Sequence, residues 1–313
     1  MLDKEKNFVS AVIYVHNAEN RIEDFLKMVI SVLENNFEYS EVICVNDSSE
    51  DNSLAEIRRV SKIVTSANVS VIHMGYFHGL EVAMDAGMDL AIGDFVFEFD
   101  STVLDFGMAE VMGIYQRALQ GYDIVSAVPD RKEKLTSKLF YRVFDRYTNL
   151  SYGMHTESFR ILSRRAINRV ASMSRAVPYR KAIYASAGLE TDMVMYQPNR
   201  SFVAKIDKKE QGYRARLAMD SLVLFTEVGY RLAMGMTAFM MLVSIFMVAY
   251  SVIVYVTANP VAGWTTTVLF FSIAFSGLFG ILTIVVKYIQ LLTSLVFRRK
   301  NYSFKNIEKL TKQ

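Results

Sequence analysis

Cysteine and proline are scarce in this sequence of 313 residues, which has one cysteine, Cys44, and four prolines. A single cysteine excludes a disulfide framework and a cysteine-based zinc site. So few prolines argue against long polyproline linkers. The sequence also lacks a G-x-G-x-x-G after its first apolar segment and a G-K-[ST] anywhere, which excludes the common dinucleotide-binding and P-loop signatures.

Charge is missing from one long part of the chain. Apolar residues make up 52% and charged residues 21%, a balance that excludes an intrinsically disordered protein. The net charge of +3 is too small to indicate nucleic acid, so we expect no such partner. Residues 232–286 contain no Asp, Glu, Lys or Arg. Residues 1–231 hold 28 basic and 31 acidic residues, whereas residues 287–313 hold seven and one.

The uncharged stretch is long enough for two membrane crossings, because one crossing needs about 20 apolar residues. We expect spans at about 232–256 and 264–286, joined by turn-forming residues 257–263. Lys and Arg flank the outer ends but are absent from the joining segment, which predicts that both ends are cytoplasmic. The alternative, a helical hairpin buried in a soluble protein, is disfavoured because soluble helices seldom run so far without charge.

This hairpin sets the expected domain organisation. Residues 1–7 are polar and charged, so we expect no signal peptide and a body that stays in the cytoplasm. We expect a cytoplasmic domain over 1–206 and an amphipathic juxtamembrane segment over 207–231. The hairpin over 232–286 follows, and 287–313 form a basic cytoplasmic tail.

The body alternates between strand-like and helix-like sequence. Strands are predicted at 8–15, 41–47, 69–74, 94–99 and 123–128. Helices are predicted between them at 20–36, 53–64, 80–92 and 104–119. Such alternation is typical of βαβ units, a mostly parallel sheet and helices on both faces. The sequence therefore predicts an α/β, Rossmann-like fold, in which ligands bind beyond the carboxyl ends of the strands.

Polar residues follow three of the predicted strands. They lie at 14–20, 46–53 and 98–102, with the sequences YVHNAEN, NDSSEDNS and EFDST. Because the carboxyl ends of parallel strands meet at one edge of a sheet, the three clusters can converge on one cleft.

These motifs resemble those of family 2 glycosyltransferases with the GT-A fold. NDSSEDNS is similar to the family's D-D-G-S-x-D-x-[ST], and residues 78–100 are similar to its stretch from donor loop to metal motif. Residues 135–146 and 158–170 resemble its acceptor-side segments. Together with the hairpin, they resemble the polyprenyl-phosphate glycosyltransferases, which include the bacterial GtrB type and dolichol-phosphate mannose synthase. The match covers nearly the whole chain.

The resemblance implies an enzyme that moves a sugar from a nucleotide-diphosphate sugar, UDP-linked, to a polyprenyl phosphate. In bacteria this lipid is undecaprenyl phosphate, which places the protein in the inner membrane with its catalytic domain in the cytoplasm. GtrB-type relatives imply an inverting transfer and a homo-oligomer, commonly a tetramer. Two other functions stay open: transfer to another lipid acceptor, and an inactive scaffold that kept the fold.

A divalent ion, Mg²⁺ or Mn²⁺, is expected because two adjacent phosphates need a cation and these ions prefer carboxylate oxygens. Glu98 and Asp100 are two residues apart at a strand end, so both side chains face one way. They fit a metal–phosphate clamp and stand where the family usually has D-x-D. The replacement of the first Asp by Glu leaves the metal preference open.

Other roles follow from the resemblance alone. Asp47 matches the acid that contacts the nucleobase, and Tyr14, Asn17 and Glu19 lie on the neighbouring loop, where they match the family pattern loosely. Four cations are candidates for phosphate contacts: Arg131, Lys138, Arg142 and Arg160.

Many relatives have an Asp before the F-R of the acceptor segment, where this chain has Ser158, preceded by Glu157. Glu157 is the candidate to replace that acid. Alternatively no general base is needed, because the acceptor phosphate is already anionic, and catalysis rests on positioning and metal electrostatics.

Overall fold

The computed structural model describes residues 4–131, 156–173, 179–199 and 302–311, with single residues and short runs between 212 and 292. The chain divides into two compact units. The first consists of Met1–Asp145, Asn149–Leu217 and Arg299–Gln313. The second consists of Arg146–Thr148 and Ala218–Arg298. The first unit is therefore completed by chain that follows the second in sequence.

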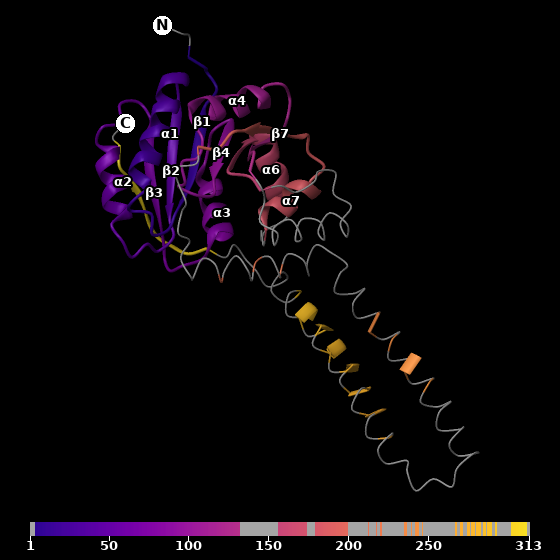
Figure 1. Ribbon diagram of the computed structural model, residues 1–313. Coiled ribbons are helices and arrows are strands. Elements are labelled where there is room, and N and C mark those ends of the chain that lie inside the picture. The colour runs from indigo at the N-terminus through magenta and orange to yellow at the C-terminus, as the bar shows by residue number, and fades with distance from the viewer. Residues whose placement is uncertain are drawn as a thin grey trace, which may run out of the picture. The chain divides into compact units, whose positions relative to one another are not determined.

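The first unit contains an eight-stranded sheet with the order β7-β5-β6-β4-β1-β2-β3-β8 (Figure 1). Its strands are β1 Val9–Val15, β2 Ser40–Asn46, β3 Asn68–Met74, β4 Phe95–Phe99, β5 Ile124–Pro129, β6 Phe159–Ser163, β7 Thr191–Tyr196 and β8 Phe304–Lys309. The pairs β1–β2, β1–β4, β2–β3 and β5–β7 are parallel. The pairs β4–β6, β5–β6 and β3–β8 are antiparallel. The prediction of a mostly parallel α/β sheet is confirmed.

Helices pack on both faces of this sheet. They are α1 Ile22–Asn36, α2 Ser53–Ser61, α3 Leu80–Leu90, α4 Met108–Ala118, α6 Arg164–Met173 and α7 Arg180–Ser186. The apolar stripes of α1 and α4 share one core with Ile13, Cys44 and Phe97 of the sheet. On the opposite face α3 approaches closely at Gly87, where an added Cβ would lie 2.4 Å from a methyl group of Val12.

All five predicted strands and four predicted helices are present, and the largest shift is the start of α4, at Met108 instead of 104. The prediction did not include β6, β7 or β8. A buried arginine interrupts the apolar pattern of β6, and β8 is a mostly exposed edge strand without apolar alternation. β8 lies within the segment expected to be only a basic tail.

The second unit includes the two expected spans, 232–256 and 264–286, most of which lies outside the described residues. The residues that are described there are helical. Within the described part of the chain, no single helix has both the length and the apolar character that a membrane crossing requires. Inside this unit Gly280 lies against Met236, and the Lys287 ammonium lies 2.8 Å from Asp220.

Candidate active site

Asp47 is the centre of a loop cluster at the carboxyl ends of β2 and β3. The side chain is fully buried, and its Oδ1 accepts a hydrogen bond from the backbone N–H of His78 at 2.8 Å. Its Oδ2 accepts from the N–H of Gly79 at 2.8 Å and from the Tyr14 hydroxyl at 3.2 Å. Burial raises the pKa of Asp47, and the two backbone N–H groups oppose that rise.

Asn17 and Glu19 tie the loop after β1 to the loop after β2. The Asn17 side-chain oxygen accepts from the N–H of Glu50 at 2.9 Å, and a Glu19 carboxylate oxygen accepts from the N–H of Asn52 at 3.0 Å. Asn17 holds a left-handed backbone with φ of 46°, which asparagine tolerates better than most residues. The structure therefore places Tyr14 near the end of β1 and Asn17, Glu19 and Asp47 on adjacent loops, so these four residues lie at neighbouring strand ends, as the sequence predicted.

Glu98 and Asp100 lie where β4 ends, beside Arg160 of β6. Antiparallel pairing sets Glu98 opposite Arg160, so the guanidinium reaches both carboxylates. Arg160 Nη1 lies 3.2 Å from Glu98 Oε2, and Nη2 donates to Asp100 Oδ2 at 2.6 Å. Arg160 Nε lies 3.0 Å from Glu157 Oε2. Four of the predicted site residues are thus brought together.

Arg180, at the start of α7, completes this cluster and was not predicted. Its Nη2 donates to Asp100 Oδ1 at 2.6 Å, and its Nη1 lies 2.9 Å from Glu98 Oε1. Its backbone N–H and Nε both donate to one carboxylate oxygen of Glu81, at 3.0 and 2.8 Å. The Tyr184 hydroxyl donates to Glu98 Oε1 at 2.7 Å. No spacing rule links Arg180 to the strand-end motifs; its arginine in a short amphipathic segment was the only signal.

The cluster is deeply buried and carries almost balanced charge. Arg160 and Arg180 are 1% and 2% exposed. Burial by itself would raise the pKa of Asp100, but the charges of Arg160 and Arg180 outweigh it and hold that pKa well below its ordinary value. Burial alone would lower the pKa of both arginines. The charges of Asp100 and Glu98 outweigh it and hold both pKa values above the ordinary value, with a further contribution from Glu157 to Arg160 and from Glu81 to Arg180.

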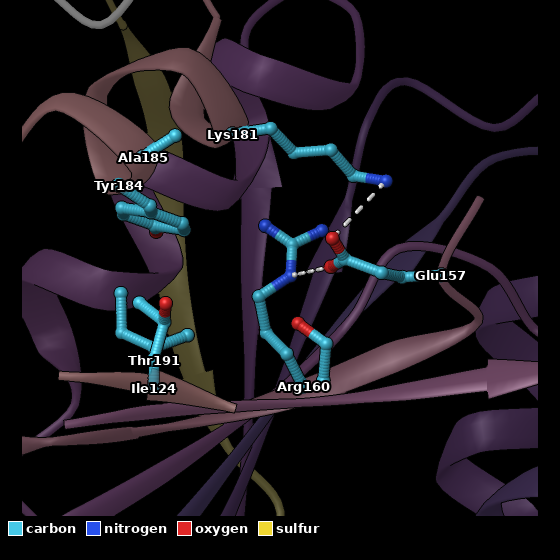
Figure 2. Close-up of a pocket in the computed structure, with 8 residues that line it drawn as sticks. Ile124, Glu157, Arg160, Lys181, Tyr184, Ala185 and Thr191 are labelled. Carbon is cyan, nitrogen blue, oxygen red and sulfur yellow. Dashed lines mark ion pairs between the residues drawn. The ribbon is translucent and has the colours of Figure 1, made fainter. Parts of the chain in front are cut away.

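Lys181 adds a third cation, its ammonium lying 3.7 Å from Glu157 Oε1. Figure 2 shows Lys181 and Arg160 both directed toward Glu157 at the wall of a small cavity. The cavity measures about 20 Å³, which is room for a single water molecule. Among the described residues, four carboxylates, from Glu81, Glu98, Asp100 and Glu157, face three cations, from Arg160, Arg180 and Lys181, which leaves one more acidic than basic group in this part of the cluster.

The two carboxylates of the E-x-D motif differ in how well they fit a metal ion. The Asp100 side chain is 18% exposed, whereas Glu98 is fully buried. Both oxygens of each carboxylate face guanidinium nitrogens, and one Glu98 oxygen also accepts from Tyr184. Among the described residues, no three His, Cys, Asp or Glu side chains form a group that could hold a metal. Both carboxylates thus anchor the arginines, and Asp100 is the one with part of its side chain exposed.

Of the three remaining predicted cations, one is exposed and two lie outside the described residues. The Arg131 side chain is 53% exposed, with Nη1 3.4 Å from Asp105 Oδ2. The Tyr196 hydroxyl lies 2.9 Å from Asp105 Oδ1 and 2.6 Å from Ser158 Oγ, which connects this edge of the sheet to the acceptor segment. Lys138 and Arg142 lie outside the described residues.

The fold is a mostly parallel α/β sheet with a buried cluster of carboxylates and arginines where β4 ends. The family model described as glycosyl transferase family 2 matches residues 10–171, more than half of the chain, and the chain therefore belongs to that family. This confirms the resemblance drawn from the motifs.

Relatives and solved structures agree with this assignment. The chain is 26% identical over 276 residues to the bactoprenol glucosyl transferase of Shigella phage SfV, covering 86% of this chain and 88% of that protein. It is 26% identical over 200 residues to the uncharacterized glycosyltransferase sll0501 of Synechocystis, and the match spans 62% of each chain. The structure of glucosyl-3-phosphoglycerate synthase from Mycobacterium tuberculosis with Mn²⁺ and UDP-glucose has a TM-score of 0.52 at 13% identity, covering 71% and 80% of the two chains. That likeness confirms the GT-A fold.

Proposed function

We propose that this glycosyltransferase moves a sugar from a UDP-linked donor to a polyprenyl phosphate, undecaprenyl phosphate in bacteria. The observation that carries the proposal is the buried cluster in which Arg160 and Arg180 hold Asp100 at the carboxyl end of β4. The acceptor class is supported by the name of the phage SfV relative, a bactoprenol glucosyl transferase. The resemblance to GtrB-type proteins implies that the transfer inverts the anomeric configuration.

The donor base is proposed to bind beside Asp47. The loops after β1, β2 and β3 meet around this carboxylate. Among the described residues, Oδ1 accepts one hydrogen bond, from the N–H of His78, and keeps a further lone pair, whereas Oδ2 accepts from both Gly79 and Tyr14. Tyr14, Asn17 and Glu19 shape the same loops. A UDP-linked donor is supported by the solved structure of similar fold that contains UDP-glucose.

Asp100 is proposed to hold Mg²⁺ or Mn²⁺ together with diphosphate oxygens of the donor. Such ions are commonly bound by one or two carboxylates plus substrate phosphates, so a single, partly exposed carboxylate suffices. The excess negative charge of the cluster favours a cation at its open end. When bound, the ion neutralises charge that develops on the leaving nucleotide. Glu98 serves this arrangement indirectly, by fixing both arginines.

The acceptor phosphate is proposed to meet the cations of the acceptor-side segments, Arg131, Lys138 and Arg142. A phosphate monoester is anionic at neutral pH, so it needs orientation more than deprotonation. Glu157 matches this view, because its carboxylate is occupied by Arg160 and Lys181 and is nearly buried. We propose that Glu157 positions these two cations.

Membrane anchoring by two helices in 232–286, with both ends cytoplasmic, is also proposed. Its support within the second unit is a stripe of exposed apolar side chains at helical spacing. The stripe consists of Phe271, Phe275, Leu278, Leu282, Val285, Ile289 and Leu292. Water disfavours so long an exposed apolar face, whereas hydrocarbon accepts it. The inner membrane and a homotetramer follow from the resemblance to GtrB-type proteins.

The test is a transfer assay with full-length protein, undecaprenyl phosphate, Mn²⁺ or Mg²⁺ and a panel of labelled nucleotide sugars. We expect label in the lipid phase with one UDP-sugar, and none with Asp100→Asn. Glu98→Gln, which keeps the shape and the tyrosine contact, should leave the metal dependence unchanged while lowering stability. Protein that binds UDP but labels no lipid with any donor would contradict the proposal and favour another acceptor or a scaffold.

A further inference from the structure

The C-terminal strand β8 contacts the loop that encloses Asp47. β8 runs antiparallel to β3, with Ile72 opposite Ile307 and Met74 opposite Phe304. Beyond this pairing, the backbone N–H of Gly75 donates to the carbonyl oxygen of Ser303 at 2.7 Å. Gly75 begins the loop 75–79, whose last two N–H groups donate to Asp47. The C-terminal chain is therefore connected to the proposed donor site through this one loop. Ser303 is hydrogen-bonded to the first residue of the loop, and the last two residues of the loop are hydrogen-bonded to Asp47.

The His78 ring forms the second contact between this loop and the C-terminal chain. Its Nε2 accepts from the backbone N–H of Ser303 at 3.4 Å, and its Nδ1 lies 2.5 Å from the carbonyl oxygen of Tyr76. Because the Ser303 amide needs an acceptor and the carbonyl needs a donor, these partners assign the proton to Nδ1. The same ring stacks on Tyr76 with centroids 3.8 Å apart, and Tyr76 is 61% exposed.

Packing between the two segments is tight at Gly75. An added Cβ would lie 2.9 Å from Ser303 Oγ and 3.2 Å from the Ser303 carbonyl oxygen. Further along, Arg58 makes a two-point contact with Glu308, and the N–H of Val69 donates to the Thr311 hydroxyl. The C-terminal chain is thus fixed to the sheet along the whole of β8, and Ser303 is held where the loop needs it.

We propose that Ser303, which directly precedes the C-terminal strand β8, is a positioning residue for the donor-binding loop 75–79. The proposal rests on the assignment of the donor site to Asp47. The chain reaches β8 directly after the second unit, which ends at Arg298. The segment that follows the expected membrane hairpin therefore completes the nucleotide site.

The experiment measures UDP binding to full-length protein in the presence of Mn²⁺, with Gly75→Ala as the first variant. We expect the Kd for UDP to rise about tenfold, because alanine pushes Ser303 and the loop apart. The donor KM should rise with it, while the acceptor KM stays unchanged. Gly113→Ala is the matched control, because an added Cβ there meets nothing within 4 Å.

A second variant tests whether the contact between the added methyl group and the Ser303 hydroxyl causes the loss of UDP affinity. Ser303→Ala removes the hydroxyl that an alanine at position 75 would meet, so it should restore much of the UDP affinity in the Gly75→Ala background. Equal UDP affinity for Gly75→Ala and Gly113→Ala would overturn the positioning role alone. Failure of the unmodified protein to bind UDP would overturn the donor-site assignment and the positioning role together. If Gly75→Ala does not fold, Tyr302→Phe, which removes a contact to Asp89, should still weaken UDP binding, and no change would overturn the proposal.

Discussion

Arg180 Nη2 lies 2.6 Å from Asp100 Oδ1, although the two residues are 80 positions apart in sequence. Arg160 holds the other oxygen of the same carboxylate at the same distance. Asp100 is thereby held by two guanidinium groups. Each of these is in turn held by a further carboxylate, that of Arg180 by Glu81 and that of Arg160 by Glu157. The orientation of this one side chain is set before any ligand arrives, which is the preorganisation that electrostatic catalysis requires.

Replacing Arg180 should therefore reduce catalysis and stability together. We expect Arg180→Ala to lower turnover by at least about 100-fold, because Asp100 loses a preorganised donor. It should also cost about 3–5 kcal/mol of unfolding free energy, because buried Glu81 and Glu98 lose their partner. Arg180→Lys keeps the charge but not the fork, so it should recover stability more than turnover. The measurements are single-turnover rates and denaturant unfolding.

Arg59→Ala is the control for that experiment. Arg59 pairs with Glu23 and Glu56, and its side chain is 59% exposed, so its loss should change stability by less than about 1 kcal/mol. Wild-type turnover in Arg180→Ala would remove Arg180 from the site.

Stability should fall at acid pH through Asp100. Its pKa is lower in the folded protein than the value of about 3.9 expected when unfolded, so the ionised carboxylate stabilises the fold at every pH above that value. This contribution declines as the pH drops below about 4 and is lost once the pH passes below the folded-state pKa. Unfolding free energies measured between about pH 6 and 2 should decline more for the wild type than for Asp100→Asn. Parallel curves would show that Asp100 is not held by the arginines in solution.

The close packing of α3 on the sheet predicts that a substitution at Gly87 lowers the free energy of unfolding. Gly87→Ala places a methyl group 2.4 Å from Val12 Cγ1 and 2.8 Å from Val45 Cγ2. The resulting shift should cost about 1–3 kcal/mol. Gly113→Ala, on α4 with open space around it, should be neutral or stabilising by up to about 1 kcal/mol. Equal unfolding free energies for the two variants would contradict the packing of α3.

Membrane anchoring is checked by carbonate washing of isolated membranes. The exposed apolar stripe between Phe271 and Leu292 and the absence of charge from 232–286 predict that the protein stays in the pellet. A soluble GT-A domain held only by its basic residues would be released, since high pH removes electrostatic attachment. Release of the full chain into the supernatant would contradict the two-span anchor.

Much of the fold could be predicted from the sequence, because the spacing of apolar residues along the chain indicates which residues are buried. β1 and β2 are buried almost throughout and read as apolar runs, and α1 carries its apolar residues at helical spacing. A serine directly before a helix favours a cap, and the Ser163 hydroxyl accepts from the N–H of Ala166 at the start of α6. β8 was not predictable in this way, because an edge strand of exposed, charged residues has no apolar pattern.

The sequence predicted the site residues that belong to motifs, such as those at strand ends. It did not predict residues that join the site only through tertiary contacts. Glu98, Asp100 and Arg160 were recognised as candidates from motif positions. Arg180 and Glu81 were not, because each is an ordinary charged residue until the fold sets it against a buried partner. The structure also shows a difference between the E-x-D carboxylates that spacing alone could not reveal: the same two arginines hold both, but Glu98 is fully buried and Asp100 is 18% exposed.

The most direct test of the central claim compares two acceptors that differ only in the phosphate. Full-length protein, Mn²⁺ and the labelled UDP-sugar that the donor panel selects are incubated with undecaprenyl phosphate or with undecaprenol, and the label in the lipid phase is counted. The account predicts label in the phosphate-bearing lipid and none in the alcohol, because it has the acceptor recognised as an anion that needs no general base. Equal labelling of the two lipids, or label only in undecaprenol, would contradict it.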